Sequence, residues 1–134
     1  MTVANAVLIT HENRDLSHHG IDTIAQDQTE VYFSQSQPSV VAFHCKDRFD
    51  LALINTLARE KAKNPSQSLI LLDENLPGGA IADIHNRLQV FRVLPYALSD
   101  QLPEKFQEGF SEYYRLEQTK KLAEMVNEKN DELK

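Results

Sequence analysis

Four short apolar runs, separated by segments with helical spacing, constrain the fold of this chain more than any other feature. The runs lie at residues 6–9, 40–43, 69–72 and 90–94. The first three are nearly continuous rather than alternating, which is typical of strands buried on both faces of a parallel sheet. Arg92 interrupts the fourth run and favours an edge strand for it. A weaker fifth strand is expected at residues 21–25.

Apolar residues recur at helical spacing after the second and the third run. Only short helices fit at residues 12–19 and 29–35. Strand and helix therefore alternate along the chain, which predicts an α/β fold: a doubly wound five-stranded parallel sheet with helices on both faces. The two periodic sets are Phe49, Leu53 and Leu57, and Ile81, Ile84 and Leu88.

The carboxyl-terminal stretch predicts one extended helix, with Ser99 or Asp100 as its cap and Pro103 in its first turn. We expect residues 1–114 to form the globular domain and residues 115–134 to form a helical extension that acts as a coiled-coil linker. A solvated tail helix is the alternative. A core-facing stripe is expected at Leu102, Phe106, Phe110 and Tyr113, and a heptad seam follows at Leu116, Thr119, Ala123, Val126, Asn130 and Leu133.

Charge and cysteine content exclude several classes of function. The formal net charge is −6 and the basic residues are scattered, so neither a nucleic acid nor a membrane is an expected partner. The single cysteine, Cys45, cannot form an internal disulfide, and no run is long enough to span a bilayer. We expect a cytoplasmic location. No cofactor fingerprint and no nucleophile–base pair is evident, so we expect no enzymatic activity and no cofactor.

The order of these elements resembles the receiver domain of bacterial two-component response regulators, of the chemotaxis-regulator-like, flavodoxin-like type. The resemblance runs from Ala6 to Leu133 and is strongest near the end of the chain, at residues 90–95, 98–102, 113–116 and 127–130. These last segments look like receivers whose final helix continues as a coiled coil toward an output domain. The segment between His11 and His44 is shorter than in the family.

The resemblance implies a phosphoacceptor pocket at the carboxyl ends of the strands. In the family an acidic pair holds Mg²⁺, an Asp accepts the phosphoryl group, and a hydroxyl and a Lys contact it. In this chain the acceptor position falls on His44 and the hydroxyl position on Asp73. The remaining matches are Thr10 and His11 for the acidic pair, with Glu12 just beyond, and either Leu94 or Tyr96 for the Lys.

These substitutions imply a degenerate pocket that cannot form an aspartyl phosphate. We therefore expect a phosphorylation-independent signalling module, which binds a protein partner or passes a signal to an output domain and forms a homodimer. By resemblance, its interface includes Ile81, Ile84, Leu88 and Phe91, together with the seam of the last helix.

A ligand- or metal-sensing domain is the alternative, because His11, His44 and Asp73 are expected to share one crevice. A pH-sensitive pocket is also open, since His can titrate near neutrality. We nevertheless expect these residues to have only a structural role: their side chains fill the vacated pocket, form hydrogen bonds there and hold no metal.

Overall fold

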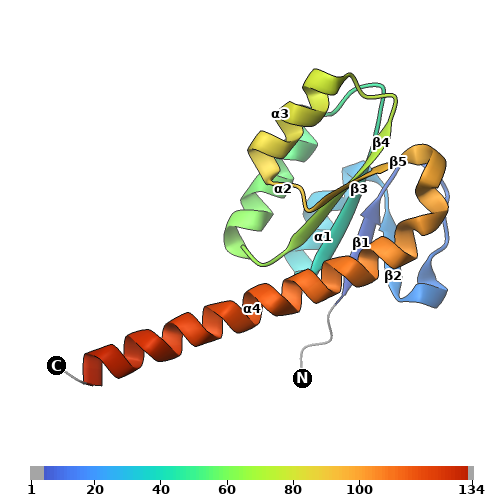
Figure 1. Cartoon of the computed structure of the whole chain (residues 1–134). Helices are drawn as coiled ribbons and strands as arrows, with labels where there is room; N and C mark the ends of the chain where they lie inside the picture. The colour runs from blue at the N-terminus through green and yellow to red at the C-terminus, as the bar shows by residue number, and fades with distance from the viewer. Residues whose placement is uncertain (1–4, 133–134) are drawn as a thin grey trace.

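Five parallel strands form one sheet in the part of the chain that the structure describes. The computed structural model describes the backbone of residues 5–132 and the side chains of residues 5–126. The strand order is β2-β1-β3-β4-β5, and every neighbouring pair is parallel (Figure 1). This topology confirms the doubly wound, flavodoxin-like α/β fold. The strands are β1 (Ala6–Ile9), β2 (Ile21–Ile24), β3 (Val40–Lys46), β4 (Ser68–Glu74) and β5 (Arg92–Pro95).

The α-helices lie in the segments where they are expected, with one exception. The segment at residues 12–19 was expected to be a short helix, but it contains only the 3-10 turn η1 (Ser17–His19). Asp15 accepts hydrogen bonds from the amide and hydroxyl of Ser17, and Gly20 closes the turn at φ 75°. The α-helices are α1 (Thr29–Gln35), α2 (Leu51–Lys63), α3 (Gly78–Leu88) and α4 (Leu102–Glu132), and two further 3-10 turns are η2 (Gln26–Gln28) and η3 (Tyr96–Gln101).

The two faces of the sheet are covered unequally. On one face, Phe33 of α1, Leu57 of α2 and Ile84 of α3 pack against Val41 and Leu71 of the central strands. On the other face the cover comes from α4, which contributes Leu102 and Phe106, and from the loop around Leu16. Alternation along β3 and β4 separates these two cores, because successive side chains of a strand point to opposite faces.

The start of α4 differs from the sequence prediction. Ser99 and Asp100 were expected to cap the helix, but both lie within η3, and α4 begins at Leu102. Pro103 occupies the first turn, as expected. Strand β5 is an edge strand, as Arg92 in its sequence indicated, and Arg92 and Val93 are exposed.

Helix α4 continues well past the sheet (Figure 1). Its first turns are buried, with Leu102 fully covered and Phe106 1% exposed. Farther along, Leu122, Met125 and Val126 are all more than half exposed. No helix in the part of the chain that the structure describes is long and apolar enough to cross a membrane.

Candidate functional site

The carboxyl ends of the strands bring together polar side chains that are far apart in the sequence. Ile9 of β1 pairs with Phe43 of β3, so Thr10 and His44 are neighbours one position farther on. Glu74 ends β4, and Tyr96 follows β5 directly. Because all strands are parallel, these four residues share one edge of the sheet. His44 lies at their centre.

The His44 imidazole is buried and engaged at both nitrogens. Its side chain is 0% exposed. Nδ1 lies 2.9 Å from Oγ1 of Thr10, and Nε2 lies 2.7 Å from Oε1 of Glu74. The amide of Glu12 donates to the same Thr10 oxygen at 3.1 Å. These contacts agree if the Thr10 hydroxyl donates to Nδ1 and Nε2–H donates to the Glu74 carboxylate.

Two aromatic rings enclose the imidazole. The His11 ring stacks on one side with a centroid distance of 4.5 Å, and the Tyr96 ring stacks at 5.1 Å with an interplanar angle of 13°. Burial lowers the pKa of His44 and outweighs the opposing effect of its hydrogen bond to Glu74. Burial therefore favours the neutral form of the imidazole.

A second network ties the amino-terminal loop to the start of η3. The Tyr96 hydroxyl donates to Oε1 of Glu12, and Nε of Arg14 donates to Oε2 of the same carboxylate at 2.8 Å. Arg14 also donates to Oγ of Ser99 at 2.9 Å. The hydrogen bond from Tyr96 lowers the pKa of Glu12 and raises the pKa of Tyr96. Glu12 is thus held as a carboxylate beside the stacked rings.

Asp73 does not join this cluster, contrary to the expectation that it shares a crevice with His11 and His44. It pairs in register with Cys45, one position past His44, so it points to the opposite face of the sheet. There its Oδ1 accepts a hydrogen bond from the amide of Leu76 at 2.9 Å and closes the turn after β4. Glu74, which the sequence prediction did not include, takes the place beside His44.

Leu94 also lies outside the pocket. It is 3% exposed and packs in the core under α4, so of the two candidates for the Lys position only Tyr96 reaches the site. Arg14 and Glu74 are the residues that sequence reasoning missed. A period-two reading of β4 could have found Glu74, because Ile70, Leu72 and Glu74 share one face of the strand.

Several expected interface residues are buried instead. Ile84 is fully buried and Leu88 is 2% exposed, because both form the face of α3 that packs on the sheet. They cannot contact a partner. Ile81 is partly buried against the same core, and Phe91 is partly exposed beside β5.

The seam residues of α4 have mixed outcomes. Leu116 is partly exposed, and Thr119, Ala123 and Val126 are exposed. Asn130 lies on the described helix backbone, whereas Leu133 lies outside the described residues.

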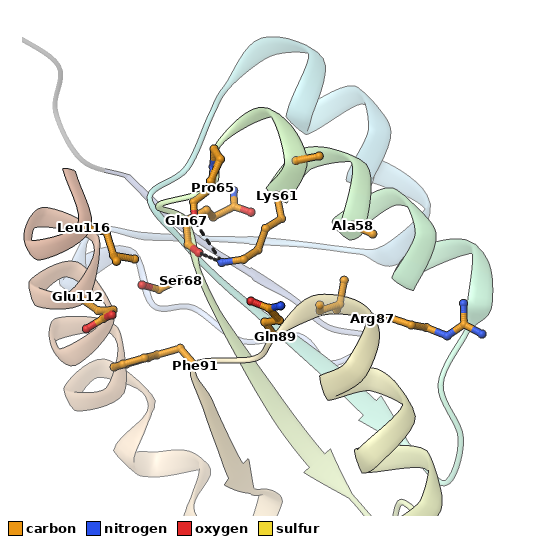
Figure 2. A pocket seen from close by; sticks show the side chains of 12 residues that line it. Ala58, Lys61, Pro65, Gln67, Ser68, Arg87, Gln89, Phe91, Glu112 and Leu116 are labelled. Atoms are coloured by element: carbon orange, nitrogen blue, oxygen red, sulfur yellow. Dashed lines mark hydrogen bonds between the residues drawn. The ribbon is translucent and has the colours of Figure 1, made fainter. Parts of the chain in front are cut away.

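A cavity of about 560 Å³ lies at the opposite, amino-terminal edge of β4, between the ends of α2 and α3 and helix α4 (Figure 2). Lys61 projects into it and donates hydrogen bonds to the carbonyls of Gln67 at 2.6 Å and Pro65 at 3.4 Å. Burial lowers the pKa of Lys61. These bonds tie the end of α2 to the start of β4, which is a structural role.

Comparison with solved structures identifies the fold. The chain is similar to the signal receiver domain of an HD domain-containing protein from Pseudomonas fluorescens Pf-5, with a TM-score of 0.66 and 18% identity over 88% of this chain and 96% of that one. It is also similar to NtrX from Brucella abortus, solved with ATP, with a TM-score of 0.69 and 15% identity over 90% of this chain and 30% of NtrX.

Sequence comparison alone finds no such likeness. No family model matches the chain, and no curated protein matches it significantly. The similarity therefore lies in the arrangement of strands and helices. This chain has the fold of a signal receiver domain.

Proposed function

We propose that this chain is a receiver-like signalling module that acts by binding and without aspartyl phosphorylation. The observation that supports this proposal most is His44, a fully buried imidazole near the end of the central strand, at the position that the resemblance assigns to the acceptor Asp. Its ring is held by Thr10, Glu74, His11 and Tyr96. The pocket is filled by the side chains of the chain itself.

The chemistry of the pocket argues against phosphoryl transfer to it. An acyl phosphate needs a carboxylate nucleophile and cations to neutralise the transferred group. Here Glu12 and Glu74 flank the imidazole and would repel a phosphoryl anion. The position of the expected Lys presents the ring of Tyr96 instead of an ammonium group. Phosphohistidine at His44 is equally disfavoured, because both ring nitrogens already have partners.

The route of a signal is proposed to run from the pocket into α4. Tyr96 is the first residue of η3, and η3 leads directly into α4 at Leu102. Tyr96 stacks on His44 and bonds Glu12, while Arg14 bonds Ser99 within η3. A partner or ligand that separates these contacts would release the start of the long helix. If the start of α4 can pack in two ways, with and without these contacts, a ligand that favours one of them acts as a switch.

The far part of α4 is proposed to pair with a second copy of the chain, or to continue as a coiled coil into an output domain. Its exposed apolar residues Leu122, Met125 and Val126 do not continue the buried stripe of Leu102 and Phe106. At 3.6 residues per turn, the centres of the two stripes are turned apart by roughly 170°, so they lie on nearly opposite faces of the helix. Pairing would therefore leave the contacts between α4 and the sheet intact.

Incubation with acetyl phosphate and Mg²⁺, followed by intact-mass measurement, tests the proposal. We expect no added phosphoryl group, whereas a receiver with an intact acceptor Asp, treated in the same buffer, gains one. His85→Ala serves as the matched surface control for His44→Ala. A stable phosphorylated species that persists in His85→Ala and disappears in His44→Ala would overturn the proposal, and so would a modified carboxylate identified by peptide mapping.

A further inference from the structure

Four metal-ligating side chains converge at the carboxyl edge of the sheet. One ligand atom from each of His11, Glu12, His44 and Glu74 lies within 4.8 Å of all the others. We propose that this cluster is a binding site for a transition-metal dication, with Zn²⁺ as the best-matched ion. The inference goes beyond signalling and does not depend on it, because it stands on the donor set alone.

The donor types select the metal. Two imidazoles and two carboxylates are a set that Zn²⁺ accepts in tetrahedral geometry, with bonds of about 2.0–2.2 Å. Mg²⁺ prefers oxygen ligands in an octahedron, so the imidazoles disfavour it. Two carboxylates also balance the charge of a dication. Tetrahedral donors lie roughly 3.4 Å apart at these bond lengths. The widest donor separations, which reach up to 4.8 Å, must therefore contract, while Nε2 of His44 and Oε1 of Glu74, now 2.7 Å apart, must separate slightly.

The positions of the donors permit that contraction. His44 is fixed in the core, with its Nε2 already 2.7 Å from Oε1 of Glu74. A metal ion would replace the proton shared by these two atoms. His11 is exposed at the rim, and Glu12 and Glu74 are partly exposed, so their side chains can adjust. Glu12 keeps acceptor capacity, since a carboxylate has about four lone-pair sites and Tyr96 and Arg14 use two of them.

Thr10 provides the outer support that such a site needs. When Nε2 of His44 binds a metal, the ring proton must reside on Nδ1, 2.9 Å from Oγ1 of Thr10. A hydroxyl donates one hydrogen bond and accepts two. Thr10 can therefore donate to Nδ1 in the metal-free state, or accept from Nδ1–H and from the Glu12 amide in the bound state. This is the orienting contact that metal-bound His residues require.

A solvent-filled hollow lies beside the cluster. A polar cavity of about 190 Å³ borders His11 and His44, and its other walls include Gln26 and Asp50. Lys46 and Arg48 also line it. The His44 side chain itself is 0% exposed, so binding at its Nε2 requires a displacement of the His11 ring, which is exposed at the rim.

Zn²⁺ titration of tag-free protein, by calorimetry and by competition with a chromophoric chelator, tests the site. We expect one ion per chain and a tetrahedral visible absorption spectrum with Co²⁺ as the probe. His11→Ala and Glu74→Gln alter residues at or near the surface, so both variants should fold, and each should weaken binding at least tenfold. Thr10→Val should weaken it about 10- to 100-fold, as the loss of an outer-shell partner does.

Two controls separate this site from surface binding. Asp73→Asn changes the carboxylate on the opposite face of the sheet, and the double variant His18→Ala/His19→Ala removes the stacked surface pair. Both should bind Zn²⁺ as the parent chain does. Unchanged affinity in His11→Ala and Glu74→Gln, or loss of binding in the His18/His19 variant, would overturn the proposal.

Discussion

At the scale of single residues, adjacent side chains of β3 have opposite environments. His44 faces the polar edge under the start of α4, and Cys45 faces the core under α2. Cys45 is 4% exposed, and burial raises the pKa of its thiol to about 12, with the charges of Asp73 and Asp50 adding to the effect. The thiol is therefore un-ionised over the physiological range, and Cys45 is a packing residue.

Alkylation should report this environment directly. A thiol reacts as the thiolate, so Cys45 should react with iodoacetamide at pH 8 far more slowly in the native protein than in urea. The measurement is the fraction of alkylated chain by intact mass against time. Equal rates in the two conditions would contradict the burial of Cys45.

The free energy of unfolding should also decrease as the pH rises, because of Cys45. The unfolded thiol loses its proton near pH 8.5, whereas the folded thiol keeps it until about pH 12, so above about pH 8.5 the unfolded state binds fewer protons. The free energy of unfolding should then decrease by up to about 1.4 kcal/mol per pH unit. Urea midpoints between pH 7.5 and 10 measure it. Cys45→Ala should remove this part of the slope, and an equal slope in both proteins would contradict the assignment.

At the scale of secondary structure, Gly109 sets how closely α4 approaches the sheet. A Cβ built at this position would lie 2.8 Å from Cγ1 of Val40 and 3.4 Å from Cβ of Ser68. The hydroxyl of Ser68 donates to the carbonyl of Gly109 at 2.8 Å. From the sequence this glycine looks like a helix-weakening residue. In the fold it permits a close contact between α4 and the starts of β3 and β4.

Gly109→Ala should therefore destabilise the protein although Ala is the better helix former. The helix gains about 1 kcal/mol from Ala, but overpacking against the buried Val40 costs about 1–3 kcal/mol. We expect a net loss of about 1 kcal/mol in urea denaturation. Gly79→Ala, in the first turn of α3, is the control: nothing lies within 4 Å of the added Cβ, so it should not destabilise the protein and can stabilise it through the helix propensity of Ala. Adding Val40→Ala to Gly109→Ala should relieve the clash, and a coupling energy of zero between the two changes would contradict it.

At the scale of the whole molecule, the carboxyl edge of the sheet is connected directly to the long helix α4. The carboxyl edge carries the His44 cluster and leads through η3 into α4, while α4 itself crosses the second face and continues beyond the sheet (Figure 1). Tyr96 is thus connected through η3 and α4 to the exposed apolar end of the helix, so a change in its contacts can be transmitted along that helix. This arrangement supports the proposal that α4 carries the output.

Dimerisation through α4 should depend on its exposed apolar residues. Leu122→Glu/Val126→Glu places two charges on the exposed apolar face of α4, which must exclude water in a dimer, so this variant should be monomeric while the parent chain is a dimer. Light scattering coupled to gel filtration measures the mass. Val31→Glu, at an equally exposed position on α1, should stay dimeric. A monomeric parent chain at its highest soluble concentration would contradict the proposed pairing.

The sequence by itself determined the elements, because each has a local period. Continuous apolar runs marked the buried strands, Arg92 marked an edge, and a spacing of three to four residues marked α2, α3 and α4. Residues 12–19 have no such period, and their helix was wrongly expected. Which side chains of neighbouring strands meet depends on register between the strands, which no local pattern carries. Alternation along β4 puts Glu74, and not Asp73, on the same face as Ile70 and Leu72, but only the tertiary structure shows that this face meets His44. The tertiary structure also buries Ile84 and Leu88 and brings Arg14 and Tyr96 from distant segments to one site.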